Sequence, residues 1–366
     1  MGAIQEIFKT YGTDYIEKYK ERMPYAHYKA ISTIQDCRSS KHGINVYNCK
    51  SCKDVQIIYR ACGSRNCPNC QKHKTDEWLQ KRFEESVPGE HFMVTFTIPE
   101  DLRSFARSTQ EIAYDAMFQA SSEALRQLMA DKKYIGCDLP GFFGVLHTWG
   151  RKLPYHPHIH YIVPGGGIDK KTETWKRAKD GFLVSVHALS KLYKGKLKAI
   201  LKEKDLLKDI PSGVWRQNFV VDSRAVGKNS EKALKYLAPY VYKPAISDSR
   251  IISVKNDRVT FSYRKKGSRR HRKMTVSAFE FIRRFLQHVL PSGFMKVRYY
   301  GFMSPNCKIK TPAIRLMVEA AHNGELTPEK ETPAVPDKPE KTDFCCPQCG
   351  GEMEFTQTVL RFEMIT

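Results

Sequence analysis

Three histidines stand at alternate positions in the segment HPHIHYIVPGGG, residues 156–167. Alternate residues of a β-strand project from the same face of a sheet, so His156, His158 and His160 are expected to share one face, with Ile159 pointing into the core behind them. A pair of imidazoles flanking one apolar residue can hold a divalent metal ion and leave coordination positions open for substrate oxygens. The spacing therefore predicts a metal site of catalytic type, and the three glycines that follow are expected to end the strand in a turn.

The third ligand of this site is left open by the sequence. His156 lies on the same face if the strand continues through Pro157, a poor strand residue, and His147 in the segment VLHTW is the alternative. Position 162 is isoleucine, which excludes metallo-hydrolases of the HxHxDH type. Histidine-triad nucleotide hydrolases use a pattern that HPHIHYI matches, but that class accounts for neither the charge nor the cysteines of this chain.

Six of the eleven cysteines fall between residues 37 and 70. Cys49 and Cys52 form one CxxC pair, and Cys67 and Cys70 form a second pair after residues 53–66. Each CxxC supplies two thiolates to a tetrahedral ion, so these two pairs predict a structural zinc site whose four protein ligands leave no open position.

Further candidate zinc ligands surround these pairs. A second tetrahedral site, or an exchange of ligands with the first, is predicted from four nearby residues: Cys37, His42, Cys62 and His73. The C-terminal pair Cys346 and Cys349 is a weaker indication, because a complete site would need Cys307 or a second chain. The sequence therefore predicts one or two structural Zn²⁺ ions and leaves the C-terminal pair open.

The charge of the chain points to a polyanionic partner. Lysine and arginine total 61 against 39 acidic residues, which gives a formal net charge of +22 at pH 7. The sequence shows neither a basic amphipathic helix with an apolar face at one end nor an apolar run of roughly 18 residues, so membrane binding is not expected. The N-terminus does not read as a signal peptide, and a cytoplasmic, bacterial protein is expected.

One strongly basic segment, YRKKGSRRHRK at residues 263–273, reads as a hairpin loop suited to phosphate contact. Its predicted DNA-binding residues are Arg264, Lys265, Lys266, Arg269, Arg270, Arg272 and Lys273.

A nucleophile is suggested by the segment EKALKYLAPYVY. Tyr236 and Tyr240 are four residues apart and share a face if the segment is helical. A tyrosine phenolate can attack a phosphodiester, provided that a metal ion neutralises the scissile phosphate. Pro239 is expected to kink the helix, which makes Tyr236 the safer nucleophile and Tyr242 a reserve candidate.

The elements that must position these residues follow from the sequence pattern. Residues 1–36 are expected to form a helical segment broken at Gly12, and residues 37–88 a zinc-binding domain. Residues 89–322 are expected to form the catalytic domain, with strands at 91–99, 142–149, 156–163 and 218–222 and a three-strand meander near 250–277. Residues 323–342 hold four prolines and predict a disordered linker, and residues 343–366 a cysteine knuckle. The predicted fold class is α+β.

The order of these features resembles a rolling-circle HUH transposase of the insertion-sequence-91 family, which carries two tyrosines and an N-terminal zinc-binding domain. The resemblance covers roughly residues 3–310. The phrases that carry it are CRSSKHG, YRACGSRNCPNCQ, HFMVTFTIP, VLHTWG, HPHIHYIVPGGG, KYLAPYVYKPAISDSRI and TVSAFEFIRRFLQHVLPSGFMKVRYYGF.

The resemblance implies an antiparallel sheet with the histidine pair on a central strand and helices against it. It implies catalytic Mg²⁺ or Mn²⁺, a covalent 5′-phosphotyrosine intermediate, and single-stranded DNA partners, namely element-end hairpins and target DNA, without a nucleotide cofactor. Tyr236 and Tyr240 would be the nucleophiles, and His158 and His160, with His156, the metal ligands. The alternatives are a plasmid relaxase or replication initiator with the same chemistry, and a non-catalytic zinc-dependent DNA-binding protein.

Overall fold

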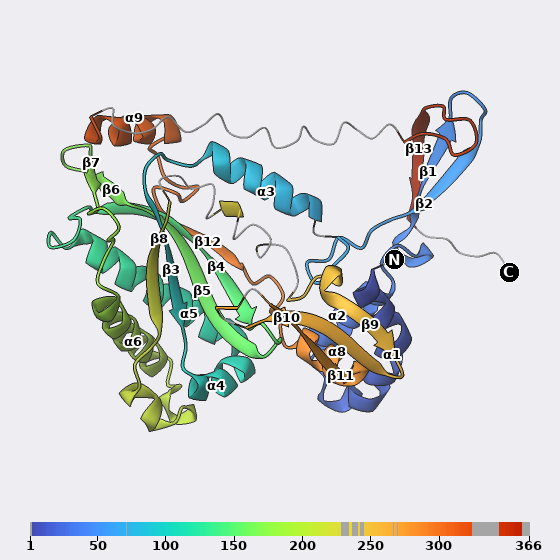
Figure 1. Cartoon of the computed structure of the whole chain (residues 1–366), viewed down its shortest axis with the longest axis horizontal. Coiled ribbons are helices and arrows are strands. Elements are labelled where there is room, and N and C mark those ends of the chain that lie inside the picture. Colours follow the sequence, from blue (N-terminus) through green and yellow to red (C-terminus); the bar gives the residue numbers. More distant parts are fainter. Residues whose placement is uncertain are drawn as a thin grey trace. The chain divides into compact units, whose positions relative to one another are not determined.

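The computed structural model describes residues 2–70, 72–227, 234–235, 241, 245–265, 267–268, 270–323 and 344–360, without the side chains of 72–74. The chain forms two compact units (Figure 1). Unit 1 consists of Met1–His73, Ile246–Val289 and Lys330–Thr366. Unit 2 consists of Lys74–Ala245 and Leu290–Glu329. Residues 246–289, which include the predicted meander, thus cluster with the N-terminal segment.

Unit 2 is built on one antiparallel sheet. Its strands are β3 (His91–Thr97), β4 (Leu139–Trp149), β5 (Tyr155–Pro164), β6 (Gly166–Asp169), β7 (Thr174–Arg177), β8 (Val221–Gly227) and β12 (Val297–Gly301). The order is β7-β6-β4-β5-β3-β8, and β12 also pairs with β4. Because β5 lies between β3 and β4, the predicted histidine strand is central in the sheet.

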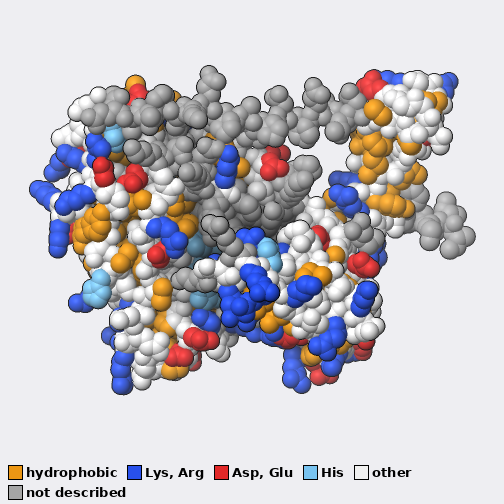
Figure 2. Space-filling model, in the orientation of Figure 1, with side chains coloured by type: hydrophobic (Ala, Val, Ile, Leu, Met, Phe, Trp, Pro, Cys, Tyr) orange, Lys and Arg blue, Asp and Glu red, His pale blue; other side chains and the backbone are white. Residues whose placement is uncertain are grey.

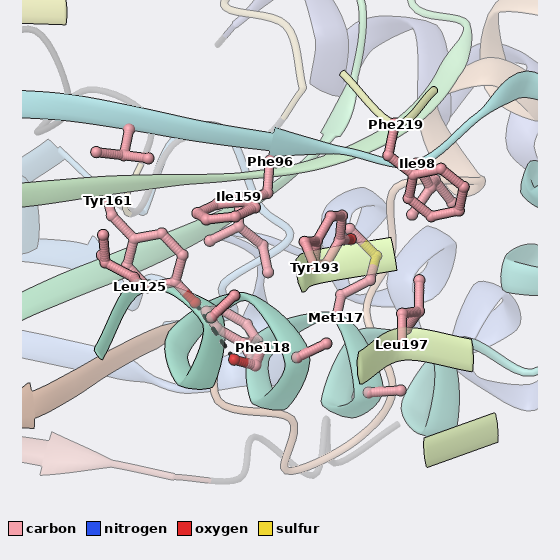
Figure 3. Packing of buried hydrophobic residues seen from close by; sticks show 14 of the residues in the cluster. Phe96, Ile98, Met117, Phe118, Leu125, Ile159, Tyr161, Tyr193, Leu197 and Phe219 are labelled. Carbon is pink, nitrogen blue, oxygen red and sulfur yellow. Dashed lines mark hydrogen bonds between the residues drawn. The ribbon is translucent and has the colours of Figure 1, made fainter. Parts of the chain in front are cut away.

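Helices pack against both faces of this sheet (Figure 1), since Phe118 and Tyr193 contact one face and Trp78 contacts Phe143 on the other. The helices of unit 2 are α3 (Lys72–Glu84), α4 (Arg103–Ser108), α5 (Gln110–Ala130), α6 (Val186–Glu203) and α9 (Thr311–Ala321). Alternate residues of β3 and β5, such as Phe96, Ile159 and Tyr161, pack against Phe118 of α5 and Tyr193 of α6 (Figure 3). The intervening residues therefore lie on the opposite face, and these include the histidines.

Unit 1 combines helices with two three-stranded antiparallel sheets. Its elements are α1 (Ala3–Tyr19), α2 (Tyr25–Gln35), β1 (Ile44–Cys49), β2 (Val55–Tyr59), β9 (Ile251–Lys255), β10 (Arg258–Arg264), β11 (His271–Ser277), α8 (Ala278–Leu286) and β13 (Met353–Val359). The sheets have the orders β13-β1-β2 and β11-β10-β9. Short 3₁₀ helices in the two units span Lys20–Arg22, Ser40–His42, Glu100–Leu102, Leu207–Asp209, Ser212–Arg216 and Asp248–Arg250.

The predicted helix break at Gly12 is wrong. Helix α1 runs through this glycine, and the break comes before Pro24. Gly12 is a contact point instead, because a Cβ atom there would lie 2.9 Å from a methyl group of Ile31 and 2.8 Å from the Gln35 amide on α2. The glycine therefore permits close packing of the two helices.

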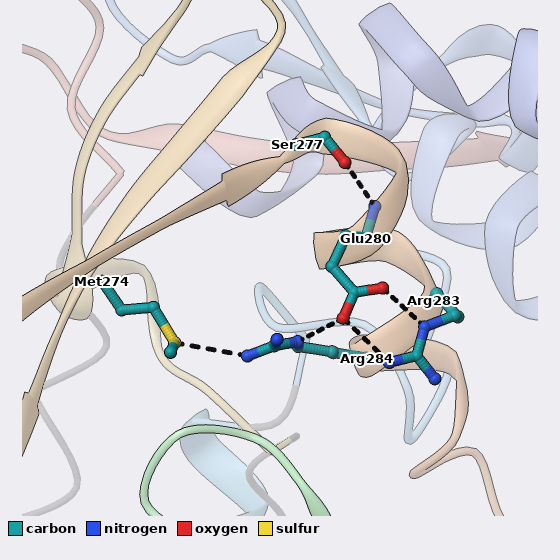
Figure 4. Close-up of polar contacts among 5 residues, drawn as sticks. All are labelled: Met274, Ser277, Glu280, Arg283 and Arg284. Atoms are coloured by element: carbon teal, nitrogen blue, oxygen red, sulfur yellow. Dashed lines mark hydrogen bonds and ion pairs between the residues drawn. The ribbon is translucent and has the colours of Figure 1, made fainter.

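The N-terminus of helix α8 shows one of the two hydrogen bonds of a capping box. The Ser277 hydroxyl accepts a hydrogen bond of 3.2 Å from the backbone N–H of Glu280. The Glu280 carboxylate does not return to the cap and instead accepts hydrogen bonds from Arg283 and Arg284, and Arg284 also contacts the sulfur of Met274 (Figure 4). The hydrogen bond from Arg283 is the largest cause that lowers the pKa of Glu280, to about 2.

The predicted fold class is confirmed: the chain is α+β, with antiparallel sheets, N-terminal helices and a cysteine-rich module. The strand expected at residues 218–222 begins later, as β8 at Val221. Strand β5 ends before the three glycines, at Pro164, but the expected turn does not follow, since β6 starts at Gly166 after a bend at Gly165. Among the described residues, every helix is too short or too polar to cross a membrane.

Candidate functional site

The register of the central sheet brings a third histidine to the predicted pair. His158 of β5 lies directly opposite His147 of β4, and His160 lies opposite Thr95 of β3. Directly opposed residues of antiparallel strands project from the same face. Nitrogen atoms of His147, His158 and His160 all lie within 4.8 Å of one another, a spacing that could hold a metal ion. We call these three residues the histidine triad.

Hydrogen bonds orient two rings of the histidine triad. Nδ1 of His158 lies 2.7 Å from the carbonyl oxygen of His156, which can only accept, so Nδ1 carries the proton and Nε2 carries the lone pair. Nδ1 of His160 lies 2.8 Å from the hydroxyl of Thr95, which leaves Nε2 of that ring available as well. Such second partners fix the tautomer and orientation of metal-binding histidines.

Burial keeps the triad in its neutral form. It lowers the pKa of His158 to about 4. Burial, followed by the charges of His160 and His158, lowers the pKa of His147 well below the usual value. Burial, followed by the charges of His158 and of Arg224 on β8, does the same to the pKa of His160. A neutral imidazole is the form that binds a metal ion, so no proton has to be displaced near neutral pH.

His156, the predicted third ligand, lies outside the triad. The pairing of β4 with β5 shifts register between His147 and Trp149, so that Trp149 lies opposite Tyr155. The His156 ring is 5.2 Å from the His158 ring, centroid to centroid, and its backbone carbonyl orients His158. The structure thus groups His147, the alternative candidate, with His158 and His160.

The predicted nucleophiles Tyr236 and Tyr240, the reserve candidate Tyr242, and Pro239 lie outside the described residues. Leu234 is described and is buried. It lines a cavity of about 750 Å³ together with Phe143 of β4 and Ile162 of β5. Ile162 lies two residues beyond His160 on the same strand, so the cavity that Leu234 lines borders the histidine-bearing face of the sheet.

The cysteines form two groups of four whose members differ from the predicted pairing. In each group the sulfur atoms lie within 4.8 Å of one another. The first group consists of Cys37, Cys62, Cys67 and Cys70, and the second of Cys49, Cys52, Cys346 and Cys349. His42 belongs to neither group, and the side chain of His73 lies outside the described residues. Cys307 is not in the group that contains the C-terminal pair, and no second chain is needed to complete it.

The hairpin of β1 and β2 explains why the two N-terminal CxxC pairs separate. Ile44 pairs with Tyr59 at the open end of this hairpin, whereas Cys49 and Cys52 lie at its turn. A strand of six residues is about 20 Å long. Cys62 follows the open end, and there it meets the second CxxC, with sulfurs of Cys62 and Cys70 3.5 Å apart. The structure therefore groups the second CxxC pair with Cys37 and Cys62, an exchange of ligands that the sequence left open, and separates it from Cys49 and Cys52.

The basic segment spans the end of β10, the turn and the start of β11. Its described members, Arg264, Lys265, Arg270, Arg272 and Lys273, are all exposed, and Lys266 and Arg269 lie outside the described residues. The guanidinium of Arg264 donates to the ring of His271 at 2.8 Å. Lysine and arginine side chains also cover more of the face visible in Figure 2 than acidic side chains do. This surface suits a polyanion.

Comparison with known proteins gives matches over most of the chain. Residues 141–310 match a family described as "Putative transposase", and residues 7–98 match one described as "Transposase zinc-binding domain". "Putative transposase y4qJ" of Sinorhizobium fredii is 34% identical over 319 residues, which are 82% of this chain and 80% of that protein. The transposase for insertion sequence element IS801 of Pseudomonas savastanoi pv. phaseolicola is 27% identical over 354 residues, 90% of this chain and 83% of that protein. No solved structure matches.

Proposed function

This chain belongs to the insertion-sequence-91 family of transposases, and from that premise we propose that it nicks and rejoins single-stranded DNA at the ends of an insertion sequence. The proposed chemistry is attack by a tyrosine side chain on a phosphodiester. The observation that carries the proposal is the histidine triad on β4 and β5, on the face of the sheet that borders the cavity lined by Leu234.

The triad fits a divalent metal ion. Three neutral imidazole nitrogens converge from two neighbouring strands, and two of the rings have their other nitrogen hydrogen-bonded. Three protein ligands leave positions for phosphate oxygens. Nitrogen donors suit Mn²⁺ better than Mg²⁺, which prefers oxygen, so we infer that Mn²⁺ is the better activator. A bound divalent ion would neutralise the scissile phosphate and favour attack by an oxygen nucleophile.

The proposed reaction has a cleavage step and a joining step. The Tyr236 phenol oxygen forms a bond to phosphorus while the bond from phosphorus to the 3′ oxygen breaks. The phenol gives up its proton, and the departing 3′ oxygen takes one up, so the products are a 5′-phosphotyrosine and a free 3′ hydroxyl. Attack by another 3′ hydroxyl on the phosphotyrosine reverses the step and joins two strands. Tyr240 supplies a second nucleophile for the second strand.

Denaturing gels test this proposal directly. Full-length protein is incubated with Mn²⁺ and labelled single-stranded DNA from each end of the element that encodes it. We expect a covalent protein–DNA band with the wild type, and loss of the band with Tyr236→Phe together with Tyr240→Phe. Tyr25→Phe is the matched control, because Tyr25 is exposed on α2 and should leave the band intact.

Two results would refute the tyrosine mechanism. One is Mn²⁺-dependent nicking that survives when phenylalanine replaces Tyr236, Tyr240 and the reserve candidate Tyr242 together. The other is wild-type protein that binds the DNA but never forms the covalent band on any end sequence, which would favour a DNA-binding protein without cleavage activity.

A further inference from the structure

Four cysteines from opposite ends of the chain form the second thiol group. Cys52 and Cys346 are 294 residues apart in sequence, yet their sulfurs lie 3.6 Å apart. The sulfurs of Cys49 and Cys349 lie 3.5 Å apart. A disulfide needs about 2.05 Å, whereas four thiolates around a tetrahedral zinc ion lie about 3.8 Å from one another. The spacing is therefore that of a metal site rather than of two disulfides.

The backbone around these cysteines is arranged as two matching turns. The N–H groups of Ser51 and Cys52 each lie 3.4 Å from the sulfur of Cys49. On the other turn, the N–H group of Gly351 lies 3.4 Å from the sulfur of Cys349. Hydrogen bonds from the backbone to sulfur stabilise the thiolate form that a metal requires.

Strand pairing holds the two turns together. Strand β13 pairs with β1, with Cys49 opposite Met353. Next to this pair, the backbone N–H of Lys50 donates to the carbonyl of Glu352 at 3.0 Å, and the two side chains form an ion pair of 2.8 Å. Cys49, Cys346 and Met353 form a small buried cluster. The group is therefore part of a packed element and not a chance encounter of surface thiols.

We propose that Cys49, Cys52, Cys346 and Cys349 bind one zinc ion, distinct from an ion held by the first cysteine group, and that this ion fastens the C-terminal segment to the β1–β2 hairpin. Four thiolates are the donor set that selects zinc. The region that matches the transposase zinc-binding domain, residues 7–98, contains only Cys49 and Cys52 of these four. The remaining two ligands come from beyond the transposase match, which ends at residue 310.

Zinc content measured by mass spectrometry tests the ligand set. With the histidine triad disabled by His147→Ala throughout, we expect two zinc ions per full-length chain, and one when Cys346→Ser and Cys349→Ser are added. The variant Cys49→Ser with Cys52→Ser should also retain one, and so should the variant that combines all four changes, because the four residues form a single site. Cys345→Ser is the matched control, since this exposed neighbour lies outside the group and should leave two ions bound. Two ions in the Cys346/Cys349 variant, or none in the fourfold variant, would overturn the proposal.

A second experiment leaves all cysteines in place. A protease site is inserted between residues 324 and 343 of the full-length chain, and the protein is cleaved there. In zinc-containing buffer the C-terminal fragment should co-elute with the rest of the chain on gel filtration, and removal of zinc with a chelator should release it. With Cys67→Ser and Cys70→Ser, which alter only the first group, the fragment should still co-elute. Separation in the presence of zinc, or retention after its removal, would contradict the fastening role.

Discussion

Lowering the pH from about 7.5 to about 5.5 should leave the affinity of the histidine triad for Mn²⁺ almost unchanged. Each imidazole must be neutral to bind a metal. With a pKa of about 4, His158 is still roughly 97% neutral at pH 5.5, whereas an ordinary histidine would be about 9% neutral. A site of three ordinary histidines would lose about tenfold in affinity per ligand, or about 10³-fold in total. For the buried triad we expect a loss of less than about twofold.

The same pKa shift makes the stability of the metal-free protein depend on pH, although the affinity for Mn²⁺ hardly does. The folded-state pKa of His158 lies below the unfolded value of 6.5. The unfolded chain therefore binds more protons than the folded chain between pH 6.5 and 4, and the metal-free protein loses stability as the pH falls through this range. At pH 5.5 the loss from His158 alone is about 1.4 kcal/mol. Circular dichroism must show folded protein at each pH before affinities are compared.

Isothermal titration of full-length protein with Mn²⁺ at both pH values gives the comparison. His147→Ala should abolish most of the binding heat and thereby assign it to the triad. A loss of 100-fold or more at the lower pH, with the protein still folded, would mean that the imidazoles titrate normally. Burial would then not set their protonation, and the reasoning from the sheet geometry would fail.

Three further predictions follow from single contacts. Thr95→Val removes the hydrogen bond to His160 and should weaken Mn²⁺ binding about 10- to 100-fold by titration, whereas Thr97→Val on the same strand should not; equal effects would contradict an orienting role for Thr95. Replacing Arg270 and Arg272 with alanine should reduce the slope of log affinity for single-stranded DNA against log salt by about 1.4, and an unchanged slope would exclude phosphate contact by these residues. Ser277→Ala should lower the free energy of unfolding by about 1 kcal/mol in denaturant titrations, and no change would show that the hydroxyl does not cap α8.

The histidine pair was predictable from sequence because strand alternation is a local property. His158 and His160 share a face in any extended strand. The choice between His147 and His156 as the third member could not be made from the sequence, because it depends on how β4 aligns with β5 and on the register shift between His147 and Trp149. An alternation pattern carries no information about cross-strand alignment. The roles of Tyr236 and Tyr240 remain predictions, which the denaturing-gel experiment described above tests.

The grouping of the cysteines also could not be predicted from spacing along the chain. The first CxxC pair was assigned to the second because few residues separate them, but the length of β1 and β2 carries Cys49 away from Cys67. Its actual neighbours lie about 300 positions later in the chain. One feature of the sequence pointed to this pairing, namely the number of cysteines. The C-terminal CxxC supplies two of the four ligands that a tetrahedral site needs, and the N-terminal cluster holds more cysteines than one such site can use.

The pairing of β1 with β13 also sets an order of events during synthesis on the ribosome. All four cysteines of the first group have been made once residue 70 is added, so that group can close early. Cys49 and Cys52 must wait until Cys346 has been added, 294 residues after Cys52. At about 5 to 20 residues per second the delay is roughly 15 to 60 s. For that interval the nascent chain carries two exposed thiols and an unpaired strand edge, so this hairpin is where we expect oxidation or mispairing during biosynthesis to begin.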